Sequence, residues 1–274
     1  MEIGERLTNP CPKGNEIVMS TRNETVRYTT QYYKRLVRDT FGPDGTIATE
    51  WARRRIQRVL RLLDDRSFKG FILDAGSGIG TFAAILSRRT QVVALDFSKN
   101  GVSVAKSVVR AHGDRKNCEL ILCDVQYLPI RDSSVQTIVA ADLVEHLPDK
   151  QFEMFLDNCR RVLVDEGILA IYTPNATNFV NPGYALRRVW PFTDPTHIGL
   201  RSSRTLMKAL STRGFVLERR QCVDTVLDDP EVKRLRLRLI RWLTVVARFI
   251  PAIQFILGGR VCLRGRSTPK EVLK

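Results

Sequence analysis

The sequence predicts an α/β fold in which a Rossmann-like, doubly wound parallel sheet carries helices on both faces. The first observation is that short apolar runs alternate with amphipathic helical patterns between residues 71 and 173. The second is a turn with three glycines, Gly76, Gly78 and Gly80, which joins the first apolar run to a helical pattern. The third is an acidic residue at or just after the end of each of the first three strands. Ligands of such sheets bind beyond the carboxyl ends of the strands, so these acids mark a candidate binding edge.

Each element is predicted from its hydrophobic period and its flanking residues. Helical patterns at 29–37 and 47–63 come first. The core then contains strands at 71–75, 91–95, 119–123, 136–141 and 167–173 and helices at 79–89, 99–112 and 149–163. After a long loop at 174–201, Ser202 or Ser203 is expected to cap a helix that runs to Arg213, and Gly214 to end it. Strands at 215–223 and 259–263 complete the sheet.

These elements divide the chain into an N-terminal extension with lid helices (1–69), a core (70–224), an amphipathic helical insertion (225–258) and a last strand with a tail (259–274). The net charge of +15 is concentrated outside the core. Residues 71–186 carry 11 basic and 13 acidic side chains, whereas residues 187–274 carry 19 basic and 7 acidic ones. A positive field of this kind attracts anionic lipid headgroups or nucleic acid, although a solvated basic surface has the same composition.

The acids indicate which nucleotide the glycine turn binds. Asp74, directly before the turn, would repel a pyrophosphate but suits a ligand with cationic groups, such as the ammonium and sulfonium of S-adenosylmethionine (SAM). The spacing G-x-G-x-G also differs from the dinucleotide pattern G-x-G-x-x-G, which makes a dehydrogenase the weaker interpretation. Asp96 can accept hydrogen bonds from ribose hydroxyls, Asp124 can bind the adenine amino group, and the N–H of Val125 can meet a ring nitrogen. The alternative is that each acid caps the helix or turn that follows it.

At these residues the chain resembles the class I SAM-dependent methyltransferases. The segments that match that family's motifs, in order, are 73–80, 94–98, 123–129 and 141–147, and the likeness covers about residues 70–220. The resemblance implies a mostly parallel seven-stranded sheet with an antiparallel last strand, N-terminal helices over the cofactor, and SAM as the cofactor. The cofactor-binding residues expected from the motifs are Asp74, Gly76, Ser77, Gly78, Asp96, Phe97, Asp124, Val125 and Ala141. One departure is Val135-Gln136, where the family usually has Phe-Asp before its fourth strand.

His146 is the candidate catalytic base, because it follows the fourth strand and can face the transferred methyl group. The alternative is that it only shapes the pocket. Asp142, Glu145 and His146, with His197, also resemble the metal-ligand cluster of quinone O-methyltransferases and of small-RNA 3′-terminal 2′-O-methyltransferases. Many relatives with Glu-His at this place bind no metal, and the family's first ligand is usually Glu where this chain has Asp. We therefore assign no metal ligand from the sequence.

The acceptor is predicted from two segments outside the core motifs. A helical projection of residues 231–257 puts arginines on a narrow face and aliphatic residues with Trp242 on the broad opposite face. This pattern favours a helix on an anionic bilayer; packing on the chain's own core or a dimer interface is the alternative. The loop at 174–201 carries aromatic residues that can line an apolar pocket or pin the loop to the core. We therefore expect methyl transfer to an oxygen or nitrogen of a small, apolar or lipid-like acceptor at a membrane surface. An RNA ribose 2′-O-methyltransferase and a SAM-binding regulator without turnover are the alternatives.

The six cysteines show no C-x-x-C or metal-ligand spacing, and several lie in apolar runs. They are expected to be buried thiols in a reducing compartment. The first residues contain no apolar signal core, so we expect a cytoplasmic protein, peripheral on the membrane if residues 231–257 bind a bilayer. The sequence names neither the acceptor atom nor the oligomeric state.

Overall fold

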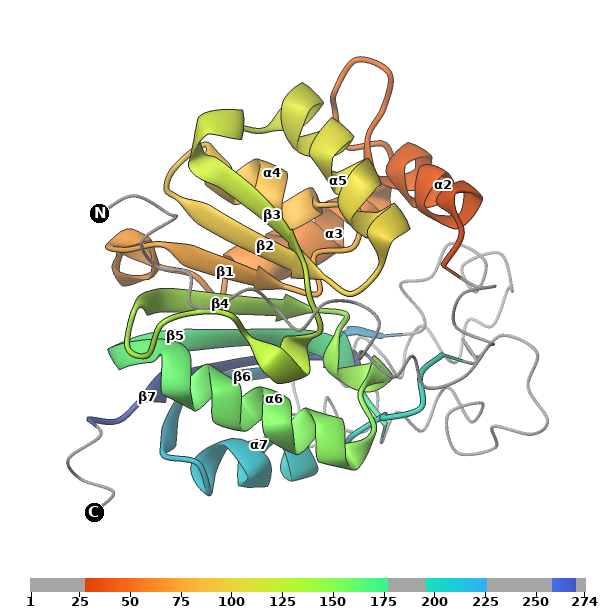
Figure 1. Ribbon diagram of the computed structural model, residues 1–274. Coiled ribbons are helices and arrows are strands. Elements are labelled where there is room, and N and C mark those ends of the chain that lie inside the picture. Colours follow the sequence, from red (N-terminus) through yellow and green to blue (C-terminus); the bar gives the residue numbers. More distant parts are fainter. Residues whose placement is uncertain (1–27, 177–195, 226–257, 270–274) are drawn as a thin grey trace, which may run out of the picture.

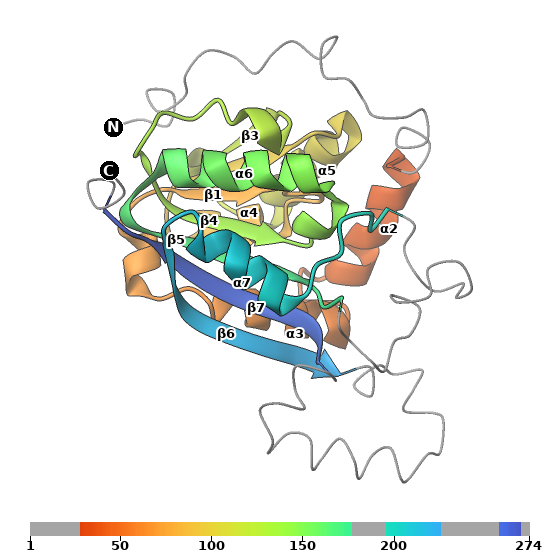
Figure 2. The ribbon, with the colours of Figure 1, turned by 90° about the horizontal axis from the view of Figure 1, so that it is seen from below.

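The computed structural model describes residues 28–176, 196–225 and 258–269, which form one seven-stranded sheet between two layers of helices (Figures 1 and 2). The strands are β1 (Ile72–Ala75), β2 (Val92–Asp96), β3 (Cys118–Leu122), β4 (Val135–Ala141), β5 (Leu163–Pro174), β6 (Phe215–Thr225) and β7 (Gly258–Ser267). The helices are α2 (Thr30–Thr40), α3 (Glu50–Leu60), α4 (Thr81–Ser87), α5 (Lys99–His112), α6 (Asp149–Val162) and α7 (Ser203–Ser211). Short 3₁₀ turns include η4 (Val125–Tyr127) and η5 (Val144–His146).

The sheet topology confirms the predicted fold. The strand order is β3-β2-β1-β4-β5-β7-β6, and the five strands β1 to β5 pair in parallel. The last strand, β7, runs antiparallel to both of its neighbours, β5 and β6. The strand order reverses between β1 and β4, so the loops after β1, β2 and β4 meet at one edge, where ligands of such sheets bind.

The alternation of side chains along the strands explains why helices cover both faces. Ile72 and Leu73 are both fully buried, but successive strand residues point to opposite faces of the sheet. Ile72 packs in an apolar cluster with residues of α3, α4 and α5, whereas Leu73 packs in a second cluster with residues of α6 and α7. Figure 2 shows α6 and α7 on one side of the sheet and α3 on the other.

Most element boundaries lie within a few residues of the prediction, but β5 begins at Leu163 rather than at residue 167, and β7 runs to Ser267 rather than to residue 263. Two further differences are informative. Helix α4 begins at Thr81 rather than at residue 79, because Gly80 takes a left-handed conformation (φ 76°) and ends the turn there. Strand β3 ends at Leu122, so Asp124 belongs to the following turn rather than to the strand end. Helix α5 has the predicted bounds, and Ser202 caps α7 as expected.

Several predictions concern residues that the structure does not describe. The insertion at 225–258 and the loop residues 177–195 lie outside the described part of the chain almost entirely. Among the described residues, no helix combines the length and apolar content that crossing a bilayer requires.

The cysteines follow the prediction only in part. Cys118, Cys159 and Cys262 are free thiols, whereas Cys123 is disulfide-bonded, so the prediction of thiols throughout was wrong for Cys123. Sequence spacing could not reveal this bond, because a disulfide depends on proximity in the fold.

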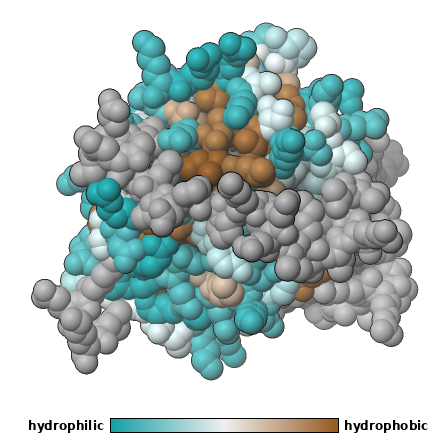
Figure 3. Space-filling view, viewed as in Figure 1, coloured by the Kyte–Doolittle hydropathy of each residue, from teal (hydrophilic) through white to brown (hydrophobic). Residues whose placement is uncertain are grey.

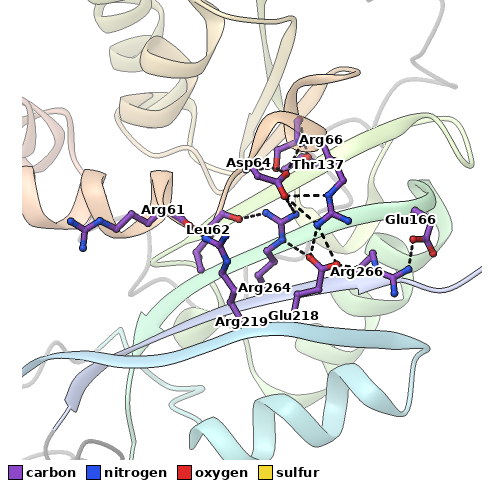
Figure 4. Close-up of polar contacts among 11 residues, drawn as sticks. Arg61, Leu62, Asp64, Arg66, Thr137, Glu166, Glu218, Arg219, Arg264 and Arg266 are labelled. Atoms are coloured by element: carbon purple, nitrogen blue, oxygen red, sulfur yellow. Dashed lines mark hydrogen bonds and ion pairs between the residues drawn. The ribbon is translucent and has the colours of Figure 1, made fainter. Parts of the chain in front are cut away.

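A buried arginine joins the N-terminal extension to the last two strands (Figure 4). Arg264 of β7 is 1% exposed and donates to the carbonyl of Leu62 (2.6 Å), to Oδ2 of Asp64 (2.8 Å) and to Oε2 of Glu218 (2.8 Å). Arg66 binds both of these carboxylates, and Arg266 binds that of Glu218. Every charge in this network has an opposite partner, as buried ions require.

Strand β3 forms one edge of the sheet and is only partly covered. Leu122 is 43% exposed, and Leu120 and Ile121 are partly buried. Apolar side chains gather in the same part of the molecule, over β3 and α5, on the face that Figure 3 shows.

Candidate functional site

Other side chains pack closely against the first and last glycines of the turn after β1, whereas the middle glycine borders free space. All three glycines have positive φ. A Cβ on Gly76 would lie 2.8 Å from Cδ1 of Leu143, and a Cβ on Gly80 would lie 2.9 Å from Cβ of Ala105. A Cβ on Gly78 would meet nothing within 4 Å, and the buried Oγ of Ser77 has no hydrogen-bond partner among the described residues. The middle of the turn therefore offers free space and an unused polar atom to a ligand.

Two of the three predicted acids hold this turn in place. Oδ2 of Asp74 accepts the N–H of Ala83 in the first turn of α4 (2.9 Å), so the buried carboxylate stabilises the start of that helix. Oδ2 of Asp96 accepts the N–H of Gly78 (2.8 Å), and its Oδ1 accepts the N–H of Ser98 (2.8 Å). Burial raises the pKa of Asp74 to about 7 and that of Asp96 to about 6, although the N–H donors oppose both shifts.

Helix α2 and the residues before it bring aromatic side chains to the end of β2, and whether they cover a cofactor there stays a prediction. A Cβ on Gly101 would lie 3.1 Å from both Oδ1 of Asp96 and the hydroxyl of Tyr33, so these two groups converge there. Burial and the charge of Asp96 raise the pKa of Tyr33, which keeps the phenol neutral. Phe97, a predicted cofactor residue, packs edge to face against Tyr28, with ring centroids 5.4 Å apart.

The remaining predicted cofactor residues lie on neighbouring loops. Asp124 uses both carboxylate oxygens locally, because Oδ1 accepts the backbone N–H of Gln126 and Oδ2 its side-chain amide, each at 2.9 Å. The capping role that the sequence left open is therefore present. Val125 is buried in η4, and Ala141 is the buried last residue of β4. Contacts of these residues with a cofactor stay predictions.

Asp142 lies between two arginines from distant parts of the chain. Its Oδ2 accepts from Nε of Arg55 on α3, and its Oδ1 accepts from a guanidinium nitrogen of Arg260 on β7, both at 2.5 Å. Burial alone would raise the pKa of Asp142, but Arg260 and Arg55 lower it. Both carboxylate oxygens are thus occupied, and Asp142 does not join the metal-ligand cluster that the resemblance implies.

Glu145, His146 and His197 come together at the end of η5, with one possible ligand atom from each within 4.8 Å of the others. The two imidazoles lie edge to face, with centroids 4.9 Å apart. Nδ1 of His146 lies 3.2 Å from the carbonyl oxygen of Thr196. Because a carbonyl only accepts, this contact would place the proton on Nδ1 when the ring is neutral.

Glu145 is fully buried, and only one of its two carboxylate oxygens has a hydrogen-bond partner among the described residues. Its Oε2 accepts from the hydroxyl of Thr173 (2.9 Å), whereas Oε1 has no hydrogen-bond partner among the described residues. Burial and the negative charge of Asp142 raise the pKa of Glu145 to about 8. A buried oxygen without a partner is costly, so a ligand group at this point would stabilise the site.

The buried guanidinium of Arg201 holds the two segments of this cluster together. It donates to the carbonyls of Val144 (2.9 Å), Leu147 (3.0 Å) and Gly199 (2.7 Å), and Gly199 donates its N–H to the carbonyl of Glu145 (2.7 Å). No sequence pattern marks Arg201, Thr173 or Thr196, because their contacts join residues far apart in the chain. For the same reason, no pattern marks Arg55 and Arg260 as partners of Asp142.

The chain is similar in sequence and in fold to known methyltransferases. Residues 72–167 match a family described as "Methyltransferase domain". A probable S-adenosylmethionine-dependent methyltransferase of Mycobacterium tuberculosis is 31% identical over 175 residues, which are 64% of this chain and 58% of the relative. The chain thus spans little more than half the length of that relative.

Two solved structures share the fold. Phosphoethanolamine N-methyltransferase 2 of Haemonchus contortus, in complex with SAM, superposes with a TM-score of 0.61 at 15% identity, over 90% of this chain and 59% of that one. A SAM-dependent methyltransferase from Archaeoglobus fulgidus superposes with a TM-score of 0.60 at 17% identity, over 86% and 100%.

Proposed function

We propose that this chain, whose residues 72–167 match a methyltransferase domain family, is a class I SAM-dependent methyltransferase that methylates an oxygen or nitrogen atom of an apolar or lipid-like acceptor at a membrane surface. The assignment of SAM as the cofactor rests mainly on the glycine turn. Its middle, at Gly78, borders free space, and the N–H of Gly78 donates to Asp96. Free space over Gly78, the unused Oγ of Ser77 and a carboxylate at the end of β2 fit a nucleoside that carries an amino acid and no phosphate.

The reaction needs alignment more than leaving-group activation. A lone pair of the acceptor forms the new bond to the methyl carbon while the carbon–sulfur bond breaks, and S-adenosylhomocysteine leaves. Holding the acceptor in line with the methyl group contributes much of the rate. An O–H or N–H acceptor also loses its proton, and Nε2 of His146 is the candidate base, because the contact with Thr196 would place the proton of the neutral ring on Nδ1.

The acceptor class rests on the sequence of residues 231–257. The arginine-lined face and the broad apolar face of that segment fit the interface of an anionic bilayer, as does the excess of basic residues after residue 186. Membrane contact would place the site next to apolar acceptors.

Two experiments test this function. Incubation with methyl-labelled SAM and cell extract should place label in the lipid or apolar small-molecule fraction. Flotation with vesicles that contain anionic lipids should recover the protein at low salt and less of it at high salt. Label in RNA, with an RNA gel shift and no flotation, would favour the RNA methyltransferase instead. SAM binding without label in any fraction would favour a regulator.

A further inference from the structure

Beyond the transfer of a methyl group, we infer that Arg55 and Arg260 bind a carboxylate or phosphate group of the acceptor, which makes the acceptor an anionic amphiphile. This assignment rests on the proposed function, because it concerns the acceptor of that reaction. The affinity of the two arginines for an anion can nevertheless be measured without turnover. The site lies at Asp142 and is distinct from the general excess of basic residues outside the core.

Two arginine side chains share the carboxylate of Asp142. Arg55 and Arg260 each donate to one of its oxygens, both over 2.5 Å. Their side chains are only 16% and 20% exposed. Burial and the charge of Asp142 raise the pKa of the neighbouring Glu145 to about 8, so that carboxyl adds little negative charge at neutral pH. These four side chains together carry one net positive charge in a poorly solvated place, which favours the binding of an anion.

Arg55 has hydrogen-bonding capacity that Asp142 does not use. Its Nε donates to Asp142, whereas its two terminal nitrogens make no hydrogen bond within the part of the chain that the structure describes. A guanidinium presents its N–H donors in a planar fork that matches two oxygens of a carboxylate or phosphate. The terminal nitrogens of Arg55 are therefore the atoms that bind the anion, and Arg260 adds its charge from the second oxygen of Asp142.

Aromatic rings hold both guanidiniums and supply an apolar surface beside them. Cζ of Arg55 lies 4.8 Å from the ring centroid of Phe82 and 5.9 Å from that of Trp51. Cζ of Arg260 lies 5.4 Å from the ring centroid of Tyr172. Cation–π contacts of this kind stabilise a guanidinium through its face and do not use its N–H donors. Because Trp51 is 48% exposed, its indole is open to an apolar chain, and the combination suits an amphiphile better than a free inorganic anion.

The arginines lie next to the predicted cofactor pocket and the candidate base. Asp142 directly follows Ala141 at the end of β4, and the turn η5, which contains His146, comes next. Asp142 has a φ of 55°, a conformation that residues other than glycine rarely adopt, and its N–H donates to the carbonyl of Tyr172 over 2.8 Å. Such strained backbone is concentrated at ligand-binding sites. An anionic group bound by the arginines would thus hold the acceptor beside both the cofactor and the base.

Short amphiphiles test the site directly. Calorimetry measures the binding of octyl phosphate, octanoate and uncharged 1-octanol, with and without S-adenosylhomocysteine, at about 0.3 M salt, which screens the exposed basic residues. Octyl phosphate and octanoate should bind at least about tenfold more tightly than octanol, because hydrogen bonds between charged groups are strong. Equal or weaker binding of the charged probes would overturn the inference. Inorganic phosphate that binds as tightly as octyl phosphate would also overturn it, because the site would then hold a free anion.

Variants of helix α3 locate the site. Arg55→Gln should reduce the preference for octyl phosphate over octanol to less than about threefold, and Arg55→Lys, which keeps the charge but not the fork, should retain part of the preference. Arg53→Gln changes an exposed arginine of the same helix and should behave like the unchanged protein. An undiminished preference in Arg55→Gln would overturn the inference.

A second measurement does not depend on the folding of the arginine variants. Octyl phosphate should change the tryptophan fluorescence of the unchanged protein, and Trp51→Phe, at a half-exposed side chain near Arg55, should remove most of that response. A response that persists in Trp51→Phe would place the probe elsewhere and overturn the inference. Failure to bind SAM or S-adenosylhomocysteine would instead contradict the proposed function. The titrations without cofactor would still decide whether the arginines bind an anion.

Discussion

Gly78 donates its backbone N–H to Oδ2 of Asp96 over 2.8 Å, so the glycine turn after β1 is bound directly to the acid that ends β2. The same carboxylate binds the N–H of Ser98 at the start of α5. One side chain therefore sets the position of both loops that border the candidate cofactor pocket.

Replacing Asp96 should weaken the binding of SAM and leave the fold intact. A hydrogen bond to a charged group contributes about 1.5–3 kcal/mol, so Asp96→Asn should raise the Kd for SAM by roughly 10–100-fold. Calorimetry measures the Kd, and Asp132→Asn, in an exposed pair with Arg161, is the control. Equal affinity in the two variants would remove Asp96 from the cofactor site.

SAM binding should weaken in acid. Burial raises the pKa of Asp96 to about 6, and only the ionised carboxylate can keep its two N–H contacts and also accept from a ribose. Below that pKa the ionised fraction falls with pH, so the Kd should rise about tenfold between about pH 7.5 and about pH 5. The Asp96→Asn variant should lack this dependence. An unchanged pH profile in the variant would assign the titration to another group, such as Asp74.

Substitutions at two glycines of the turn should affect the stability of the protein and its affinity for SAM to different extents. Gly80→Ala forces a Cβ into Ala105 at positive φ and should lower the free energy of unfolding by about 2–4 kcal/mol. Gly78→Ala meets open space, so it should cost only the backbone strain of about 1–2 kcal/mol. Its methyl group enters the space assigned to the cofactor, and the Kd for SAM should rise about tenfold or more. Urea denaturation and calorimetry measure the two effects, and normal SAM binding by Gly78→Ala would place the cofactor elsewhere.

His146 should matter for turnover and not for cofactor binding. Once labelling has identified an acceptor, His146→Gln should lower kcat by about 100-fold or more and leave the Kd for SAM unchanged. A base and a metal ligand both predict this loss; they differ in whether chelator-stripped protein keeps its activity. His112→Asn should retain full kcat, and an unaltered kcat in His146→Gln would exclude both roles.

The buried arginine of β7 should contribute strongly to stability. Arg264→Met leaves the Leu62 carbonyl without its donor and removes one of the donors to the half-buried carboxylates of Asp64 and Glu218, so the free energy of unfolding should fall by about 3 kcal/mol. Arg53→Met is the matched control, because the pair that Arg53 forms with Glu50 is exposed and spans 3.6 Å. That change should cost less than about 1 kcal/mol. Similar urea midpoints for the two variants would contradict the importance of the network.

The sequence predicted the sheet because its apolar runs and glycine turn depend on local periods and backbone conformation. Asp124 shows the limit of this reasoning, because no local pattern indicated that Gln126 would occupy both carboxylate oxygens. Asp142 shows another limit. It has the spacing of a metal ligand, but arginines near opposite ends of the chain bind it, and only the folded structure brings them there.

Because β7 lies between β5 and β6, the sheet cannot be completed during translation until β7 has been synthesised. Strand β7 supplies Arg260 for Asp142 and Arg264 for Asp64, so neither acid has its full set of partners until the last strand has left the ribosome. A nascent chain that has emerged only through β6 would expose one edge of β5 and bury incompletely neutralised carboxylates. The methyltransferase motifs are synthesised early, but their final arrangement must await the C-terminal strand.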